Sequence, residues 1–240
     1  VVINCPLAIS SGVTSFIIHF LKSLLLLVVP GTLFFAALYL HIKVATPAAW
    51  LPLLNLFPYL AVIAGLFLGW RFNRTRVLWA IILIIIAERA LTMTTPFARE
   101  YTLLIAPLLV PLNLVLYGWW SERGLFTMHG VLRLLILLLQ LGGVVWLYFT
   151  RAGEVMAWLD RPLFANNFLD KAPISQIAML VMVLSMLALL VRFGKKPEAL
   201  EGSFCWILVA VGAGFCWPQH FDYWGGVAVF LLTIALIESS

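Results

Sequence analysis

Charged side chains are scarce in this sequence. Only 10% of its 240 residues are Asp, Glu, Lys or Arg, and 64% are hydrophobic, whereas an ordinary soluble domain carries roughly 25% charged residues. This composition excludes a water-soluble globular domain. It also excludes a disordered chain, because disorder requires low hydrophobicity and high net charge.

Cysteine is rare, and the spacing patterns of metal and catalytic sites are missing. Cys205 and Cys216 lie in one apolar run, about 16 Å apart along a helix, which is too far for a disulfide. We expect both thiols to be free and buried. Histidines occur singly, and no Gly-rich phosphate loop or nucleophile elbow occurs. The sequence therefore predicts no metal ion, no cofactor and no catalytic residue in these 240 residues.

Long apolar runs are abundant. A membrane-crossing helix needs about 20 mostly apolar residues, and eight segments approach or meet this length. They lie near residues 24–42, 52–70, 77–95, 102–119, 131–149, 172–191, 197–217 and 224–240. The predicted fold class is all-α, a single polytopic membrane helix bundle over residues 1–240 with the lipid bilayer as its partner. Gly65 and Gly69 form a GxxxG pattern, which is typical of close helix packing.

Basic residues are scattered singly between the apolar runs, which argues against nucleic acid as a partner despite the net charge of +5. Cytoplasmic loops of membrane proteins are enriched in Lys and Arg. With both termini in the cytoplasm, nine basic residues lie inside and six outside. The nine are Lys22, Arg71, Arg74, Arg76, Arg123, Arg133, Arg192, Lys195 and Lys196. The last apolar run has no closing Gly, Pro or basic residue, so we expect its helix to continue into further sequence.

The segment 150–171 forms the only long loop expected outside. Its apolar residues alternate with charged ones, as in a segment that lies on the membrane surface. A lid over an outward-facing pocket is the alternative. A second amphipathic segment, with Phe16, Ile17, Phe20 and Leu21 at helical spacing, precedes the first span and is expected at the interface.

Two charges lie within an expected span. A charged side chain at the centre of a membrane helix costs about 2.5–3.5 kcal/mol on insertion scales, so Glu88 and Arg89 require an explanation. Adjacent residues point about 100° apart on a helix, so pairing between these two is not assumed. Each needs a partner on another helix or a water-filled cavity. An interhelical salt bridge or snorkelling at the outer interface is one alternative, and a ligand site is an equal one.

A polar residue in the fourth span follows two prolines. Pro107 and Pro111 have no N–H and therefore free two backbone carbonyls near Asn113. These groups could bind a ligand, but a packed kink is the commoner arrangement. Gln140 lies at mid-depth in the fifth span, where a hydrogen bond to a facing amide such as Asn113 would contribute about 0.6 kcal/mol. Packing is the favoured role for this pair.

Polar and aromatic side chains gather in the short turn between the last two runs. The residues are Trp217, Gln219, His220, Asp222, Tyr223 and Trp224. Trp and Tyr alone are typical of the aromatic belt at a membrane surface. The imidazole, carboxylate and amide among them indicate a ligand-sensing pocket as the alternative. Because histidine changes charge between pH 5 and 8, a pH sensor is a further one.

Two segments have a recognisable pattern. One is P-L-N-L-V-L-Y-G-W-W-S-E-R-G-L-F-T-M-H-G-V-L-R-L at 111–134, and the other is L-L-T-I-A-L-I-E-S-S at 231–240. The first resembles a cytoplasm-facing turn in the multi-span sensor regions of bacterial diguanylate cyclases. The second resembles the last span of these proteins, just before the helix that leads into the GGDEF domain, which synthesises cyclic-di-GMP.

The resemblance implies a sensory and anchoring module in the bacterial inner membrane. An outer signal, chemical or physical, would shift the aromatic turn, and the last span would transmit the shift to a cytoplasmic cyclase domain. It also implies a homodimer, because joining two GTP molecules requires two facing active sites. The GGDEF motif is absent from these residues, so no catalytic, metal or nucleotide-binding residue is carried over.

Two other functions remain open. A small transporter would need broken helices in matching positions of two halves, and the helix with Pro107 and Pro111 has no obvious counterpart. An integral-membrane enzyme for lipid-linked substrates would need converging carboxylates and basic residues. We expect the outer carboxylates to be spread apart; they are Glu100, Glu154, Asp160, Asp170 and Asp222.

Overall fold

The computed structural model describes residues 8–43, 51–92, 95–120, 124, 127–163 and 174–239, with the backbone only for 8–20 and 51. Within these ranges the chain is helical and contains no strand, which confirms the all-α class. The helices are α1 Ala8–Lys43, α2 Leu51–Arg71, α3 Thr75–Leu91, α4 Pro96–Trp119, α5 Met128–Leu159, α6 Gln176–Lys195, α7 Ala199–Cys216 and α8 Phe221–Glu238, with the 3-10 turn η3 Pro218–His220.

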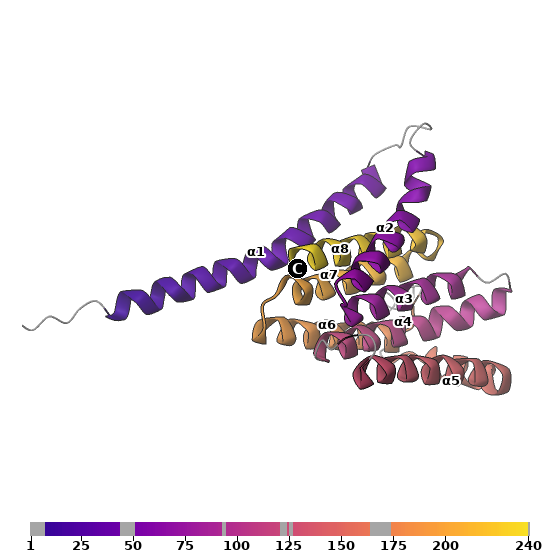
Figure 1. Ribbon diagram of the computed structural model, residues 1–240. Helices are drawn as coiled ribbons and strands as arrows, with labels where there is room; N and C mark the ends of the chain where they lie inside the picture. The colour runs from indigo at the N-terminus through magenta and orange to yellow at the C-terminus, as the bar shows by residue number, and fades with distance from the viewer. Residues whose placement is uncertain are drawn as a thin grey trace, which may run out of the picture.

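Helices α7 and α8 form the centre of the bundle (Figure 1). They pack against each other as a hairpin, with α1 and α2 on one side and α4 and α6 on the other. Helix α5 lies at the edge and contacts only α4 and α3 substantially. The amino-terminal half of α1 projects beyond the rest of the bundle in Figure 1.

Seven helices in the described part of the chain are long and apolar enough to cross a membrane: α1 from Leu21, α2, α4, α5, α6, α7, and α8 with η3. The chain is therefore a multi-pass membrane protein. Helix α3 has 17 residues, about 25 Å of helix, which is shorter than the hydrocarbon core of about 30 Å. Large apolar side chains on the outer helices are exposed on the surface of the bundle, as expected of surfaces that contact lipid.

The helix bounds differ from the sequence expectation at four places. Helix α3 ends at Leu91 instead of residue 95, and α4 begins at Pro96, because proline at the first helical position starts a helix. The amphipathic segment before the first span is continuous with it in the 36-residue helix α1. Helix α5 continues to Leu159 with a kink at Arg151, whose φ is −144° and ψ is 26°. The first part of the expected outer loop is thus helical, and its residues 164–173 lie outside the described ranges.

Glycines in α2 and α8 allow their backbones to approach closely. A Cβ on Gly65 of α2 would lie 2.9 Å from Thr233 Oγ1 of α8, and a Cβ on Gly226 of α8 would lie 2.9 Å from the Cα of Pro58 of α2. The Gly65 and Gly69 pair therefore serves close packing, as the GxxxG pattern predicts.

The two described cysteines are free, but they differ in exposure. Cys205 is buried in the core, whereas Cys216 is exposed at the last turn of α7. The prediction of two buried thiols is therefore wrong for Cys216, because this residue ends its helix at the bundle surface.

Candidate functional site

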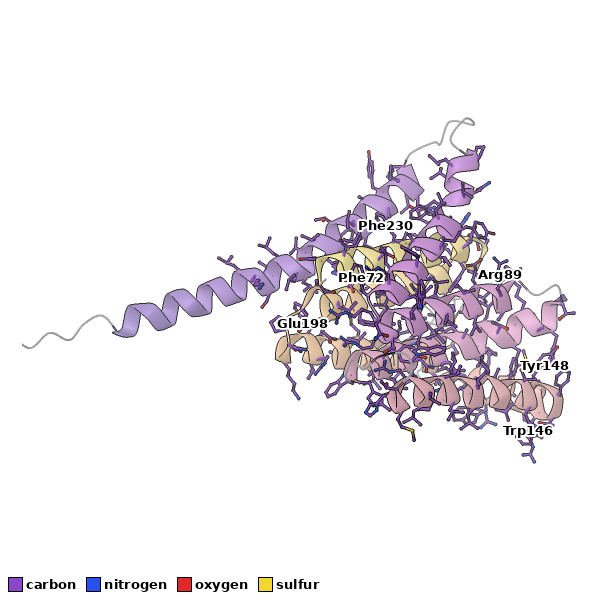
Figure 2. All side chains as sticks on the ribbon, in the orientation of Figure 1. Phe72, Arg89, Trp146, Tyr148, Glu198 and Phe230 are labelled. Carbon is purple, nitrogen blue, oxygen red and sulfur yellow. The ribbon has the colours of Figure 1, made fainter. Side chains whose placement is uncertain are left out.

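The bundle has two chemically different ends. We call the end with the α2–α3 and α6–α7 turns the basic end, and the end with the α7–α8 turn the aromatic end. Figure 2 shows Glu198 and Arg89 at these opposite ends, and Figure 1 marks the carboxyl terminus at the basic end. Helix α8 runs from one end to the other.

Five ring side chains meet at the aromatic end, and we call them the aromatic cluster: His41, Trp217, His220, Tyr223 and Trp224. The ring centroids of His41 and His220 lie 4.8 Å apart in an edge-to-face arrangement. His41 also stacks on Tyr223 at 4.8 Å, and Trp217 stacks on Trp224 at 6.1 Å. The cluster joins the last turn of α1 to the start of α8.

Further contacts fix α1 against the α7–α8 hairpin. The Tyr223 hydroxyl donates a hydrogen bond to the Ala37 carbonyl oxygen at 2.8 Å. Deeper in the bundle, the Trp206 indole donates to the Leu27 carbonyl oxygen at 2.7 Å. Gly31 allows this approach, since a Cβ there would lie 2.4 Å from the Trp206 ring. The contact between α1 and the core is therefore built from aromatic rings along its length.

Only some residues of the predicted aromatic turn belong to the aromatic cluster. Trp217, His220, Tyr223 and Trp224 lie in the aromatic cluster, whereas Gln219 is exposed at its margin. Asp222 is also exposed, but it is close enough to His41 to interact with it electrostatically. Sequence reasoning missed His41, because it treated each histidine as isolated on its own element. The available signal was its position at the end of the first apolar run, on the same side of the membrane as the turn.

Glu88 and Arg89 pair with each other, which overturns the expectation that each would need another partner. The Arg89 Nη2 lies 3.5 Å from Glu88 Oε1, and Arg89 is 58% exposed while Glu88 is 13% exposed. The guanidinium also lies over the Tyr59 ring, 6.0 Å from its centroid. Because both residues lie in the last turn of α3, the long Arg89 side chain can fold back at the surface. The two residues therefore form an ion pair at the bundle surface.

Asn113 forms the predicted interhelical hydrogen bond. Its side-chain amide donates to Gln140 Oε1 at 2.9 Å and to the Leu109 carbonyl oxygen at 2.8 Å. Asn113 is buried between α4 and α5, and both Pro107 and Pro111 lie inside α4. The amide therefore links α4 to α5 through a side-chain hydrogen bond.

Replacing Asn113 with Leu should destabilise the bundle only slightly. An interhelical hydrogen bond in a membrane contributes about 0.6 kcal/mol and at most about 1.7 kcal/mol. Equilibrium unfolding of Asn113→Leu, Gln140→Leu and the double variant in mixed micelles measures the loss. The double variant should lose less than the sum of the single ones, because both remove the same bond. Additive losses would contradict a direct coupling.

The basic end contains a buried ion pair that joins several helices. Arg76 Nη1 lies 2.7 Å from Glu201 Oε1, and the two side chains are 4% and 1% exposed. Arg76 also donates to the Gly118 carbonyl oxygen at 3.3 Å, and Arg192 lies 3.7 Å from the same Glu201 oxygen. One carboxylate at the start of α7 thus binds guanidinium groups from α3 and α6.

A second buried arginine, Arg133, lies close to this pair. Arg133 of α5 is fully buried, donates to the Thr75 hydroxyl, and lies over the Trp120 ring at 5.7 Å from its centroid. We call Arg76, Arg133, Arg192 and Glu201 the basic cluster. Nearby, Arg74 donates to the Ser239 carbonyl oxygen at 3.3 Å, which ties the end of α8 to the start of α3.

Sequence reasoning did not find the basic cluster. It interpreted the arginines only as topology determinants and Glu201 only as a first-turn acid beside a helix dipole. The charge of Glu201 is unusual because the rest of α7 is apolar and glycine-rich. A lone carboxylate in such a helix was the available signal, since a buried charge needs a paired partner.

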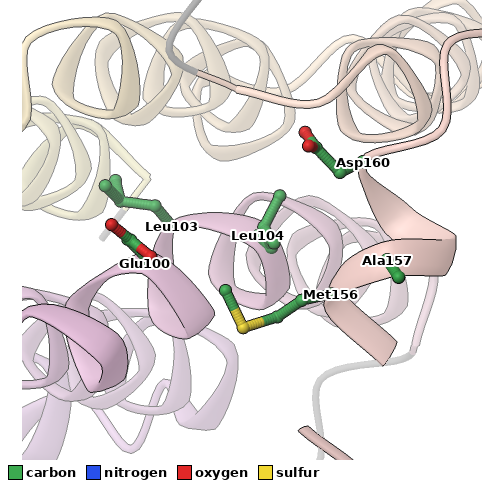
Figure 3. A pocket seen from close by; sticks show the side chains of 6 residues that line it. All are labelled: Glu100, Leu103, Leu104, Met156, Ala157 and Asp160. Carbon is green, nitrogen blue, oxygen red and sulfur yellow. The ribbon is translucent and has the colours of Figure 1, made fainter. Parts of the chain in front are cut away.

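A separate pocket of about 340 Å³ lies between the start of α4 and the last turns of α5 (Figure 3). Leu103, Leu104, Met156 and Ala157 line it, with Glu100 and Asp160 on two sides. Two of the outer carboxylates therefore converge, contrary to the expectation that all of them would be spread apart. No basic residue is among the six residues that line this pocket.

The described residues contain no group of three or more His, Cys, Asp or Glu side chains that could hold a metal ion.

Comparison with other proteins adds no further assignment. The chain matches no family model, and no curated protein or solved structure is significantly similar to it. Function must therefore be argued from the two clusters and the helices that join them.

Proposed function

We propose that this chain is the membrane-embedded sensory and anchoring module of a bacterial signalling protein. In this proposal the aromatic cluster receives a signal at the outer surface, and α8 carries it to a cytoplasmic diguanylate cyclase domain. The module would act as a homodimer in the inner membrane, since the cyclase reaction joins two GTP molecules. The two resembling segments, 111–134 and 231–240, support this assignment of the output.

The arrangement of α8 is the observation that carries the proposal. In α7, 72% of the residues of the membrane-spanning window are buried, and in the segment with α8 67% are. In each of the other five candidate spans at most 39% are buried. Helix α8 begins in the aromatic cluster and ends where Arg74 holds the Ser239 carbonyl oxygen. A displacement at one end of such a rigid, enclosed helix reaches the other end, because packed cores do not deform continuously.

The proposal includes eight membrane crossings with both termini in the cytoplasm. Helix α3 would be the eighth crossing, with Arg76 at its basic end and Arg89 at its aromatic end. The basic end would face the cytoplasm, where Lys and Arg are enriched. Arg71, Lys195 and Lys196 at this end are exposed, as loop residues that determine orientation must be.

We expect His220→Ala and Asp222→Ala to abolish the response of the full-length protein to its signal. Allosteric coupling typically changes an equilibrium about fivefold or more, and this ratio should fall to about one in both variants. The measurement is cyclic-di-GMP in cells with equal membrane levels of each variant, over a range of external conditions that includes pH.

The matched control is Asp160→Ala, which removes an exposed carboxylate from the same end but outside the aromatic cluster. It should respond like the wild type. If both cluster variants also respond normally, the aromatic turn is only a membrane belt. At the gene level, a stop codon directly after Ser240, or a following domain unrelated to signalling, would contradict the proposed output.

A further inference from the structure

Two imidazoles from distant parts of the chain meet at the aromatic end. His41 lies in the last turn of α1, and His220 ends η3 and immediately precedes α8. Their ring centroids are 4.8 Å apart at an interplanar angle of 77°. At this separation a positive charge on one ring repels a positive charge on the other, because the Coulomb energy of two charges is inversely proportional to their distance and to the local dielectric constant.

His41 has little freedom to move away while α1 stays in position. Its ring is stacked on Tyr223 and lies 5.5 Å from the buried Trp224 ring. The Tyr223 hydroxyl itself donates a hydrogen bond to the Ala37 carbonyl oxygen. A repulsion between the two imidazoles would therefore act on the end of α1 as a whole.

Several charged side chains lie around the two imidazoles. Asp222 in the first turn of α8 is the carboxylate that acts on His41 together with His220. Glu88 is near Asp222 but is paired with Arg89. From α1, Lys43 is exposed and adds positive charge at the same helix end.

Only the outer turns of α1 are able to respond. Below them, Trp206 bonds to the Leu27 carbonyl oxygen and packs on Gly31. Pro30 lies between these two contacts and removes one backbone hydrogen bond of the helix. The inner part of α1 is thus fixed to α7, and Pro30 provides a point at which the outer part bends.

We propose that the His41–His220 pair is a proton-operated switch. Binding of a second proton by the pair separates the outer turns of α1 from the start of α8. Histidine is the side chain whose unperturbed charge change falls between pH 5 and 8. The switch specifies the signal of the proposed sensory function, and only its effect on output rests on that function.

The test measures the α1–α8 distance directly. Spin labels are attached at Ile42→Cys and Gln219→Cys in the full-length protein, with the native cysteines replaced by Ala, in lipid nanodiscs. Pulsed dipolar spectroscopy between pH 8 and pH 5 should show one short distance at pH 8. A longer distance should become the major population at pH 5.

Three variants complete the test. His41→Gln and His220→Gln should each keep the short distance at every pH, and the short distance at pH 8 also shows that they fold. His129→Gln, which removes an imidazole at the opposite end, should respond like the wild type. A wild-type distance that does not change with pH overturns the switch, as does a pH response that survives in His220→Gln. If the distance responds while cyclic-di-GMP does not, the switch stands and the proposed output fails.

Discussion

Replacing Glu201 with Ala should cause a large loss of stability. The substitution leaves two guanidinium groups, those of Arg76 and Arg192, directed at a site without its carboxylate. Removing one partner of a buried ion pair typically costs about 3–5 kcal/mol, because the remaining charge stays desolvated. Equilibrium unfolding in mixed micelles measures the difference from the wild type.

The matched control is Glu198→Ala, three residues earlier at the same end. Glu198 lies 2.9 Å from Lys196, but the two side chains are 43% and 54% exposed. An exposed pair contributes about 0–1 kcal/mol, so this variant should unfold almost like the wild type. Removing both partners in Arg76→Leu/Glu201→Leu should cost less than the sum of the single variants. Equal losses in Glu201→Ala and Glu198→Ala would contradict a structural role for the buried pair.

The second large effect is expected at the contact between α2 and α8. In Gly226→Val the new Cβ would lie 2.9 Å from the Cα of Pro58 and 3.0 Å from its Cβ. Backbone atoms cannot move aside as a flexible side chain does, so the two helices must separate. Overpacking typically costs about 1–3 kcal/mol, and we expect about 3 kcal/mol because the clash involves backbone.

Gly142→Val controls for the intrinsic effect of the substitution on a helix. A Cβ at Gly142 would meet no atom within 4 Å, so only the small difference in helix propensity remains. Thermal unfolding in detergent should show a large decrease of the midpoint for Gly226→Val and little change for Gly142→Val. Similar midpoints for both variants would contradict the close α2–α8 approach.

Much of the fold could be predicted from local patterns. Each of the eight helices overlaps an apolar run in the sequence, because membrane helices must satisfy their backbone hydrogen bonds internally and expose apolar side chains. The Asn113–Gln140 bond was also predictable, since both amides lie at similar depth in consecutive antiparallel helices. Helix ends were less predictable. The continuation of α5 beyond residue 149 depends on a kink at Arg151 that no proline or glycine at that position signals.

The candidate sites were predictable only in part. The aromatic turn is contiguous in sequence, so its own residues could be identified, but His41 reaches it from a helix far away in the chain. Glu88 and Arg89 were misjudged for a different reason. An angular argument about Cβ directions does not describe a long arginine side chain at an exposed helix end.

The sequence by itself determined that this protein is an all-helical, multi-pass membrane protein, because few charges and long apolar runs permit no other solution in water or lipid. The tertiary structure alone decided what the scarce charges do. Arg71 and Arg76 look alike in sequence, yet Arg71 is exposed and Arg76 is buried against Glu201. Which arginine finds a carboxylate depends on the order and rotation of packed helices, and local hydropathy contains no information about either.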